Sequence, residues 1–257
     1  MFHSLAQQLR RRICGQKAAE PDWDLASISA EDLRIIRRAQ PYTMTGVMRI
    51  QGLIDAVRYC TRRNIPGAFA ECGVWRGGSV LAMILTLQEL GISDRDIWLY
   101  DTFEGMTAPT EHDTSFFDFD RPALEEWQEA QQTSKRVHDH LFKAEIFNEE
   151  GVRKVVLSTG YPEQRIHFVR GAVERTVPAQ MPSQLALLRL DTDWYESTRH
   201  ELTHMYPLIG SGGVLIIDDY GHWQGCRKAV DEYFSSGVAS PVLLSRIDYT
   251  GRMAIKC

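Results

Sequence analysis

The chain has 257 residues, of which 44% are hydrophobic and 25% are charged, and its formal net charge is −5. This composition supports a packed core and a single α/β domain over residues 1–257, and it excludes disorder along the whole chain. The acidic balance argues against a nucleic-acid-binding protein, because such a protein usually presents a basic face to the phosphates.

Five cysteines are widely spaced and form no CxxC pair. Their odd number, together with an N-terminus that lacks an apolar signal core, predicts reduced thiols in a cytoplasmic protein. No apolar run reaches the length of a membrane span, so we expect no membrane contact.

Residues 1–41 are predicted to form peripheral helices. Phe2 to Cys14 has the pattern of an amphipathic helix, and the segment "SAEDLRIIRR" begins with Ser29, an N-capping residue followed by acids. We expect these helices to have few partners in the core domain, which predicts a homo-oligomer.

Strands and helices alternate after a helix predicted over Met44 to Arg63. The strands are nearly continuous apolar runs, as expected when helices cover both faces of a parallel sheet. Their polar ends are Glu71, Asp101, Arg170 with Gly171, Asp191 with Asp193, and Asp218 with Asp219. The order predicts a doubly wound, Rossmann-like, mostly parallel sheet, and "PVLLSRIDYTGRMAIKC" predicts a C-terminal antiparallel hairpin at its edge.

One long insertion, residues 106–148, interrupts this alternation. Its first part has no periodicity, and "ALEEWQEAQQTSKRVHDHLFKAEIF" predicts a helix from Ala123 to Phe147. Insertions after the C-terminal end of a strand usually cover a site or form a contact. We therefore predict a lid over the substrate, with a structural or oligomer-forming insertion as the alternative.

Ligands bind at the C-terminal strand ends of open parallel sheets, so the polar residues there are informative. In "ECGVWRGGS", Gly73, Gly77 and Gly78 let the backbone approach a ligand, and the start of the following helix favours an anionic group. Trp75 replaces the second glycine of a GxGxxG motif, which argues against a dinucleotide. Asp101, about thirty residues further on, can accept the hydroxyls of an adenosine ribose. The plainer interpretations are that the glycine-rich segment only forms a tight turn and that Asp101 is only a surface acid in a loop.

Four carboxylates follow the fourth and fifth strands, at Asp191, Asp193, Asp218 and Asp219. Neighbouring carboxylates repel one another unless they are protonated or bind a cation. Carboxylate oxygens suit a hard divalent ion, and we predict that this ion is magnesium. The side chains of adjacent Asp218 and Asp219 diverge, so not all four are expected to bind. The alternative is that they only cap helices.

The segments "ECGVWRGGS", "DTFEGM", "LRLDTDWYEST" and "GGVLIIDDYGHWQGCRKAVDEYF" together resemble the macrocin O-methyltransferase family, as does "YTMTG" before the first core helix. The resemblance extends from about Tyr42 to Phe234. It implies a class I methyltransferase that depends on S-adenosylmethionine and Mg²⁺ and methylates sugar hydroxyls in natural-product pathways.

The resemblance also implies roles for individual residues. Cofactor contacts are expected from Thr43, Met44, Glu71, Cys72, Gly73, Ser79, Asp101, Thr102, Phe103, Gly171 and Ala172. Magnesium ligands are expected at Asp191, Asp218 and Asp219, with Asp191 also the leading candidate for the general base. Asp193 is then expected to organise the start of the next helix. The stretch "RGAVERTVP" departs from the family because it lacks the aromatic residues usual after that glycine.

Histidines are the rival candidates for the base: His138, His140, His200, His204 and His222. Other functions stay open at this point. The acceptor could be a catechol-like or other diol, and the acids could hold a nucleotide diphosphate in a glycosyltransferase. A non-catalytic protein that binds S-adenosylmethionine is the alternative of a different class. The sugar, its hydroxyl, and whether it is attached to a finished scaffold or to a nucleotide are not determined by the sequence.

Overall fold

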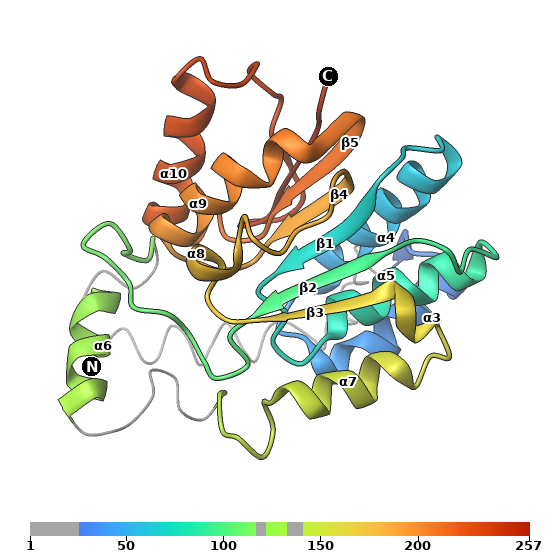
Figure 1. Cartoon of the computed structure of the whole chain (residues 1–257), viewed down its shortest axis with the longest axis horizontal. Helices are drawn as coiled ribbons and strands as arrows, with labels where there is room; N and C mark the ends of the chain where they lie inside the picture. Colours follow the sequence, from blue (N-terminus) through green and yellow to red (C-terminus); the bar gives the residue numbers. More distant parts are fainter. Residues whose placement is uncertain (1–25, 117–121, 133–140) are drawn as a thin grey trace, which may run out of the picture.

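A computed structural model of the chain describes residues 26–116, 122–132 and 141–257. The strands in these residues are β1 (Ala68–Cys72), β2 (Ile97–Asp101), β3 (Ile166–Arg170), β4 (Leu185–Leu190), β5 (Ile209–Ile217), β6 (Ser245–Arg246) and β7 (Arg252–Ile255). They form one sheet in the order β3-β2-β1-β4-β5-β7-β6 (Figure 1). Strands β1 to β5 are parallel and the β6–β7 hairpin is antiparallel, so the predicted mixed sheet is confirmed.

Helices cover both faces of this sheet (Figure 1). One face carries α4 (Val47–Arg62), α5 (Gly78–Glu89) and α7 (Glu149–Leu157), with α3 (Ala30–Ala39) outside them. The other face carries α8 (Val173–Thr176), α9 (Tyr195–His204) and α10 (Gln224–Ser235). Short 3₁₀ turns lie at Gln40–Tyr42, Glu163–Arg165 and Tyr206–Leu208, and α6 (Ala123–Gln132) lies at the edge of the molecule, away from the sheet.

Two hydrophobic cores result, because successive strand residues point to opposite faces. Phe69 and Leu187 pack towards α4 and α5, whereas their neighbours Ala70 and Leu188 pack towards α9 and α10. Both faces of the central strands β1, β4 and β5 are therefore covered, which is why most of their residues are apolar.

The chain order changes direction between β1 and β4. From β1 the chain moves outwards through β2 and β3, and it then returns to place β4 and β5 on the other side of β1. Loops that leave the C-terminal ends of β1 and β4 consequently separate, and this opens the crevice where doubly wound folds bind ligands.

The N-terminal helix α3 is less peripheral than predicted. Its serine cap is confirmed, since the hydroxyl of Ser29 accepts a hydrogen bond from the N–H of Asp32. However, Ile35 and Ile36 pack with Ile54 of α4 and with residues of α5 in a third buried cluster. The expectation that α3 has few partners in the core is therefore wrong, while the Phe2–Cys14 helix lies outside the described residues and the homo-oligomer stays a prediction.

The helix predicted from Ala123 to Phe147 is too long. Helix α6 covers Ala123–Gln132 of the described residues, residues 141–147 form turns and bends, and α7 begins after Asn148, whose side chain caps it. The predicted helix therefore does not extend through residues 141–147. Within the described residues no helix combines the length and the apolar character needed to cross a membrane.

Candidate active site

A pocket of about 380 Å³ opens at the C-terminal ends of the strands, where β1 and β4 diverge. Its size is in the range typical of small-molecule sites. Among the residues predicted for cofactor or metal, those that line it are Thr43, Met44, Gly73, Ser79, Asp101, Thr102, Gly171, Ala172, Asp191, Asp218 and Asp219. The sheet therefore brings together residues that are separated by as many as 176 positions in the chain.

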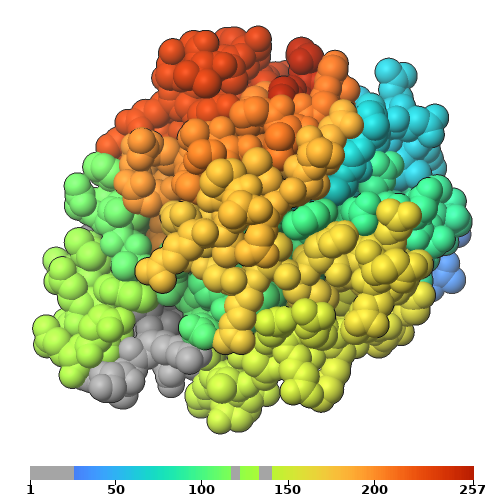
Figure 2. All heavy atoms as spheres, viewed as in Figure 1, coloured from blue at the N-terminus to red at the C-terminus, as the bar shows by residue number. Residues whose placement is uncertain are grey.

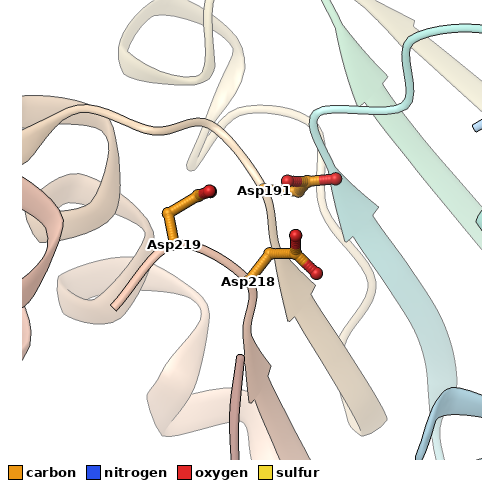
Figure 3. Close-up of side chains that lie close together, drawn as sticks. All are labelled: Asp191, Asp218 and Asp219. Atoms are coloured by element: carbon orange, nitrogen blue, oxygen red, sulfur yellow. The ribbon is translucent and has the colours of Figure 1, made fainter. Parts of the chain in front are cut away.

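Three carboxylates converge at the ends of β4 and β5 (Figure 3). One oxygen each from Asp191, Asp218 and Asp219 lies within 4.8 Å of the others. The second oxygen of Asp219, Oδ2, is buried and has no hydrogen-bond partner among the residues that the structure describes. Three acids held this closely, one of them with an unsatisfied buried oxygen, have the chemistry of a site for a hard cation.

A buried arginine underlies this acid cluster. Arg189, next to the C-terminal end of β4, is 1% exposed and bonds to Asp191 Oδ2 at 2.6 Å and to Thr45 Oγ1 at 2.9 Å. It also pairs with Glu71 on β1 and with Asp218 after β5. One guanidinium thus cross-links the ends of three neighbouring strands, and its fixed fork of donors holds the acids in place.

A second arginine reaches the cluster from α4. Arg49 pairs with Asp218 and donates from Nε to Asp248 Oδ2 at 3.0 Å. Burial raises the pKa of Asp191 to about 6 and that of Asp193 to about 8, and the negative charge of Asp191 adds to the shift at Asp193. Even with both arginines, burial therefore favours the neutral forms of these acids, and a bound cation would lower their pKa values and stabilise the charged forms.

Asp193 does not organise the start of α9, contrary to our expectation. Its backbone is in the left-handed region at φ 66°, and its carboxylate accepts a hydrogen bond of 2.8 Å from Trp223 Nε1. The N–H of Tyr195 at the start of α9 instead donates to Asp113 in the insertion, at 2.7 Å. The left-handed turn points Asp193 into the pocket and leaves the helix start to a residue about eighty positions earlier.

The loop after β1 is tied to the end of β2. The N–H groups of Val74 and Trp75 donate to Asp101 Oδ2 at 2.7 and 2.9 Å, and the N–H of Phe103 donates to Oδ1 at 2.7 Å. At Gly73, φ is 84° and an added Cβ would lie 1.9 Å from the carbonyl oxygen of Asp191. A side chain at position 73 would therefore push the β1 loop away from the acid cluster.

The segment before α4 covers the start of α5. An added Cβ at Gly78 would lie 2.6 Å from the side chain of Thr43, so the two backbones are in close contact. This contact places Thr43 and Met44 beside Ser79, and all three line the pocket.

Three of the predicted cofactor contacts lie behind the pocket wall. Glu71 is buried against Arg189, Cys72 donates to the sulfur of Met205, and Phe103 is in the hydrophobic core. None of the three is among the lining residues of the described chain. Their geometry supports the wall of the pocket, with Glu71 acting through Arg189.

Of the candidate histidines, His222 lines the pocket, where its ring lies 5.0 Å from that of Trp223. His200 bonds to the carbonyl of Val177 and packs on His204, and neither lines the pocket. His138 and His140 lie outside the described residues.

Both described ends of the insertion contribute to the pocket. Met106, Thr107, Leu141 and Phe142 line it, and the carbonyl of Thr107 accepts a hydrogen bond of 2.9 Å from Trp194 Nε1. In the space-filling view the green atoms of the insertion border the orange atoms of the C-terminal half (Figure 2).

Sequence reasoning overlooked Arg189, Arg49 and Asp113. For Arg189 a signal was present, because a charged residue inside "LALLRLD" must find buried partners, and Asp191 lies on the same face of the strand two positions later. Arg49 and Asp113 reach the site from distant segments and carry no comparable signal.

Comparison with known proteins agrees with this geometry. The family Macrocin-O-methyltransferase (TylF) matches residues 27–254 of the chain. Demethyldecarbamoylnovobiocin O-methyltransferase of Streptomyces niveus is 32% identical over 195 residues, which cover 76% of this chain and 68% of the relative.

Two further proteins are similar over most of their length. The 8-demethyl-8-(2,3-dimethoxy-alpha-L-rhamnosyl)-tetracenomycin-C 4'-O-methyltransferase of Streptomyces olivaceus is 33% identical over 224 residues, 86% of this chain and 78% of the relative. The solved structure of the O-methyltransferase NovP has a TM-score of 0.68 at 30% identity, over 84% of this chain and 82% of that one. The resemblance noted in the sequence is thus confirmed, and the chain belongs to the TylF family of S-adenosylmethionine-dependent O-methyltransferases.

Proposed function

We propose that this protein methylates a hydroxyl of a sugar carried by a natural product, with Mg²⁺ at the acid cluster. The observation that carries the proposal is the convergence of Asp191, Asp218 and Asp219 at the floor of the pocket. The relatives act, by their names, on a novobiocin precursor and on a rhamnosyl group of a tetracenomycin, which supports a sugar-bearing acceptor.

The residues present fit a magnesium ion. They supply only oxygen donors, which Mg²⁺ prefers, and Asp219 Oδ2 offers a buried oxygen that no described residue satisfies. Asp191, Asp218 and Asp219 would hold the ion. When bound, it lowers the pKa of a sugar hydroxyl and fixes its position.

The other half of the pocket fits S-adenosylmethionine, which supplies the methyl group. Gly73 and Ser79 lie at the loop after β1, Asp101 and Thr102 at the end of β2, and Gly171 and Ala172 after β3. In this arrangement the methionine part lies near the start of α5, the ribose near Asp101 and the adenine near Gly171. The excess of carboxylates over guanidiniums around the pocket favours the positive charge of the cofactor.

Asp191 is our candidate for the base that takes the proton from the hydroxyl. Its carboxylate lies at the pocket floor, and its Oδ2 is held at 2.6 Å by Arg189, which fixes its orientation. Asp193 lines the same pocket and is the second carboxylate within reach of an acceptor. The insertion, whose residues Met106 and Leu141 line the pocket, would act as the lid that excludes water.

The first test is methyl transfer from labelled S-adenosylmethionine to glycosylated natural products. We expect transfer to stop when the divalent cation is chelated and to return when Mg²⁺ is added. Asp191→Asn should lower kcat by at least about 100-fold, because it removes the base, while the affinity for S-adenosylhomocysteine stays within about twofold.

The control is Asp94→Asn, which changes an exposed acid before β2, at the opposite end of the strands. Its kcat should equal that of the wild type. Normal turnover by Asp191→Asn, or transfer that is insensitive to chelation, would contradict the proposed mechanism.

A further inference from the structure

Two large side chains with apolar surface lie at the mouth of the pocket and stay well exposed to solvent. Tyr249 is 47% exposed and Met44 is 55% exposed, and both line the pocket. Exposed apolar residues are common on protein surfaces when they occur singly, but a pair of them at the rim of a ligand pocket indicates contact with a ligand.

Tyr249 is presented by a turn that is firmly fixed. The turn joins β6 to β7, and Asp248 Oδ1 accepts hydrogen bonds from the N–H groups of Thr250 and Gly251 at 2.9 and 2.7 Å. The hydroxyl of Thr250 donates to the carbonyl of Asp218 at 2.7 Å, and the carbonyl of Thr250 accepts from the N–H of Gly221 at 2.9 Å. Because these hydrogen bonds fix the backbone of the turn, the turn loses little conformational entropy when a ligand packs on Tyr249.

Met44 belongs to the segment that lies beside this turn. Arg49 of α4 donates to Asp248 at 3.0 Å, and a Cβ added at Gly46 would lie 4.0 Å from Asp248 Oδ2. The segments 44–49 and 248–251 therefore lie side by side at the rim of the pocket, and Met44 and Tyr249 are their large exposed side chains. Because Thr250 bonds to the backbone of Asp218, this rim is directly beside the acid cluster.

The charges around the pocket determine what kind of group the rim can contact. The described lining residues include six carboxylates, those of Asp101, Glu174, Asp191, Asp193, Asp218 and Asp219. Arg49 is the one arginine or lysine among these described lining residues, and it is already paired with Asp218 and Asp248. A diphosphate at the rim would find no unpaired arginine or lysine among these described lining residues, whereas an apolar group would bury the exposed surfaces of Met44 and Tyr249.

We propose that Met44 and Tyr249 bind the apolar scaffold to which the methylated sugar is attached, and that they select such a glycoside over a nucleotide sugar. This inference rests on the proposed function, since it requires the sugar at the acid cluster. The sugar hydroxyl lies at the pocket floor, and the scaffold attached to the anomeric carbon of the sugar extends out of the pocket past the rim.

The test is calorimetric titration of the protein saturated with S-adenosylhomocysteine and MgCl₂. The probes are methyl α-L-rhamnoside, 4-nitrophenyl α-L-rhamnoside and dTDP-L-rhamnose, which share one sugar and differ in the attached group. We expect the nitrophenyl glycoside to bind about tenfold more tightly than the methyl glycoside, because one aromatic contact contributes about that much binding free energy. We expect dTDP-L-rhamnose to bind no more tightly than the methyl glycoside.

Variants assign this gain to the rim. In Tyr249→Ala the affinity ratio of the nitrophenyl to the methyl glycoside should fall to about one, in Met44→Ala it should fall in part, and Tyr249→Phe should keep it. Leu243→Ala is the matched control, because Leu243 is 84% exposed and does not line the pocket. Circular dichroism verifies the fold of every variant, and S-adenosylhomocysteine binding is measured separately because Met44 is also an expected cofactor contact.

A wild-type ratio near one, a ratio that survives Tyr249→Ala, or tighter binding of dTDP-L-rhamnose would overturn the inference while leaving the sugar acceptor intact. Failure of all three rhamnose compounds to bind, with S-adenosylhomocysteine still bound, would contradict the sugar acceptor itself and this inference with it.

Discussion

At the scale of single residues, the loop between Asp191 and Asp193 is held from behind by an acid. Glu201 on α9 is fully buried, and the hydroxyl of Thr192 donates to its Oε1 at 3.0 Å. Burial raises the pKa of Glu201 well above its ordinary value of 4.5, so the folded protein favours the protonated, neutral form of this side chain. A neutral acid fixes this loop without adding a further negative charge beside the acid cluster.

The stability of the protein should therefore depend on pH through Glu201. Its pKa is higher in the folded than in the unfolded state, so above about pH 4.5 the folded protein binds a proton that the unfolded chain releases. This contribution to stability is present below pH 4.5 and is lost as pH rises towards the folded pKa. Glu201→Gln removes this dependence.

We expect the free energy of unfolding of Glu201→Gln, relative to wild type, to rise with pH above about pH 4.5, by up to about 1.4 kcal/mol per pH unit, until the folded pKa is reached. Urea titrations at several pH values measure it. The matched control is Glu196→Gln, an exposed position on the same helix, which should follow the wild type. Parallel curves for Glu201→Gln and wild type would show that Glu201 is charged in the folded protein.

At the scale of elements, the first part of the insertion is attached to the C-terminal half as an added strand-like segment. Ser115 forms an antiparallel bridge with Trp223, and the N–H of Gln224 donates to the carbonyl of Thr114 at 2.9 Å. Asp113 accepts from the N–H of Tyr195, and a Cβ at Gly225 would lie 1.8 Å from its Oδ1. This segment thus fixes both the start of α9 and the start of α10, next to the pocket residue Trp223.

Asp113→Ala should loosen both helix starts. The substitution removes the acceptor for the N–H groups of Tyr195 and Thr110, which should lower the free energy of unfolding by about 1 to 2 kcal/mol. Hydrogen exchange should increase at Tyr195 and over residues 110–116. Glu111→Ala, which changes an exposed neighbour, is the control, and equal exchange in the two variants would refute the anchoring role.

At the scale of the whole molecule, negative charge is concentrated at the C-terminal edge of the sheet. Glu71, Asp191, Asp193, Asp218 and Asp219 meet there, and they are balanced by Arg49 and Arg189 alone among the arginines of the described chain. The folded protein holds these acids together because the strands that carry them are buried in two large cores, and burial raises the pKa of Asp193 and of Asp219. A cation that binds the folded state should therefore stabilise the entire domain.

Mg²⁺ should raise the Tm of the protein in a concentration-dependent way. At a hundredfold excess over the Kd, binding contributes about 2.7 kcal/mol, which corresponds to several degrees in a domain of this size. Differential scanning fluorimetry with and without MgCl₂ measures the shift. Asp219→Asn should abolish the Tm shift. Asp231→Asn, a surface substitution on α10, should keep the shift. A shift that persists in Asp219→Asn would show that the ion binds elsewhere.

The sequence by itself determined the layered fold and the positions of the acid cluster. Apolar runs that alternate with helices are typical of buried parallel strands, and parallel strands bring their C-terminal ends to one edge, so Asp191, Asp218 and Asp219 were expected to meet. Local signals also sufficed for the cap at Ser29 and for the glycine-rich start of α5.

Only the tertiary structure decided which charges are paired and which side chains face the ligand. Arg49 and Asp113 reach the site from segments distant in the chain, and no periodicity records such contacts. Asp193 turned out to face the pocket because its backbone takes a left-handed conformation that its residue type merely permits. Glu71 lies behind the pocket wall because the register of β1 with β4 places it opposite Arg189, and register is set by packing rather than by local sequence.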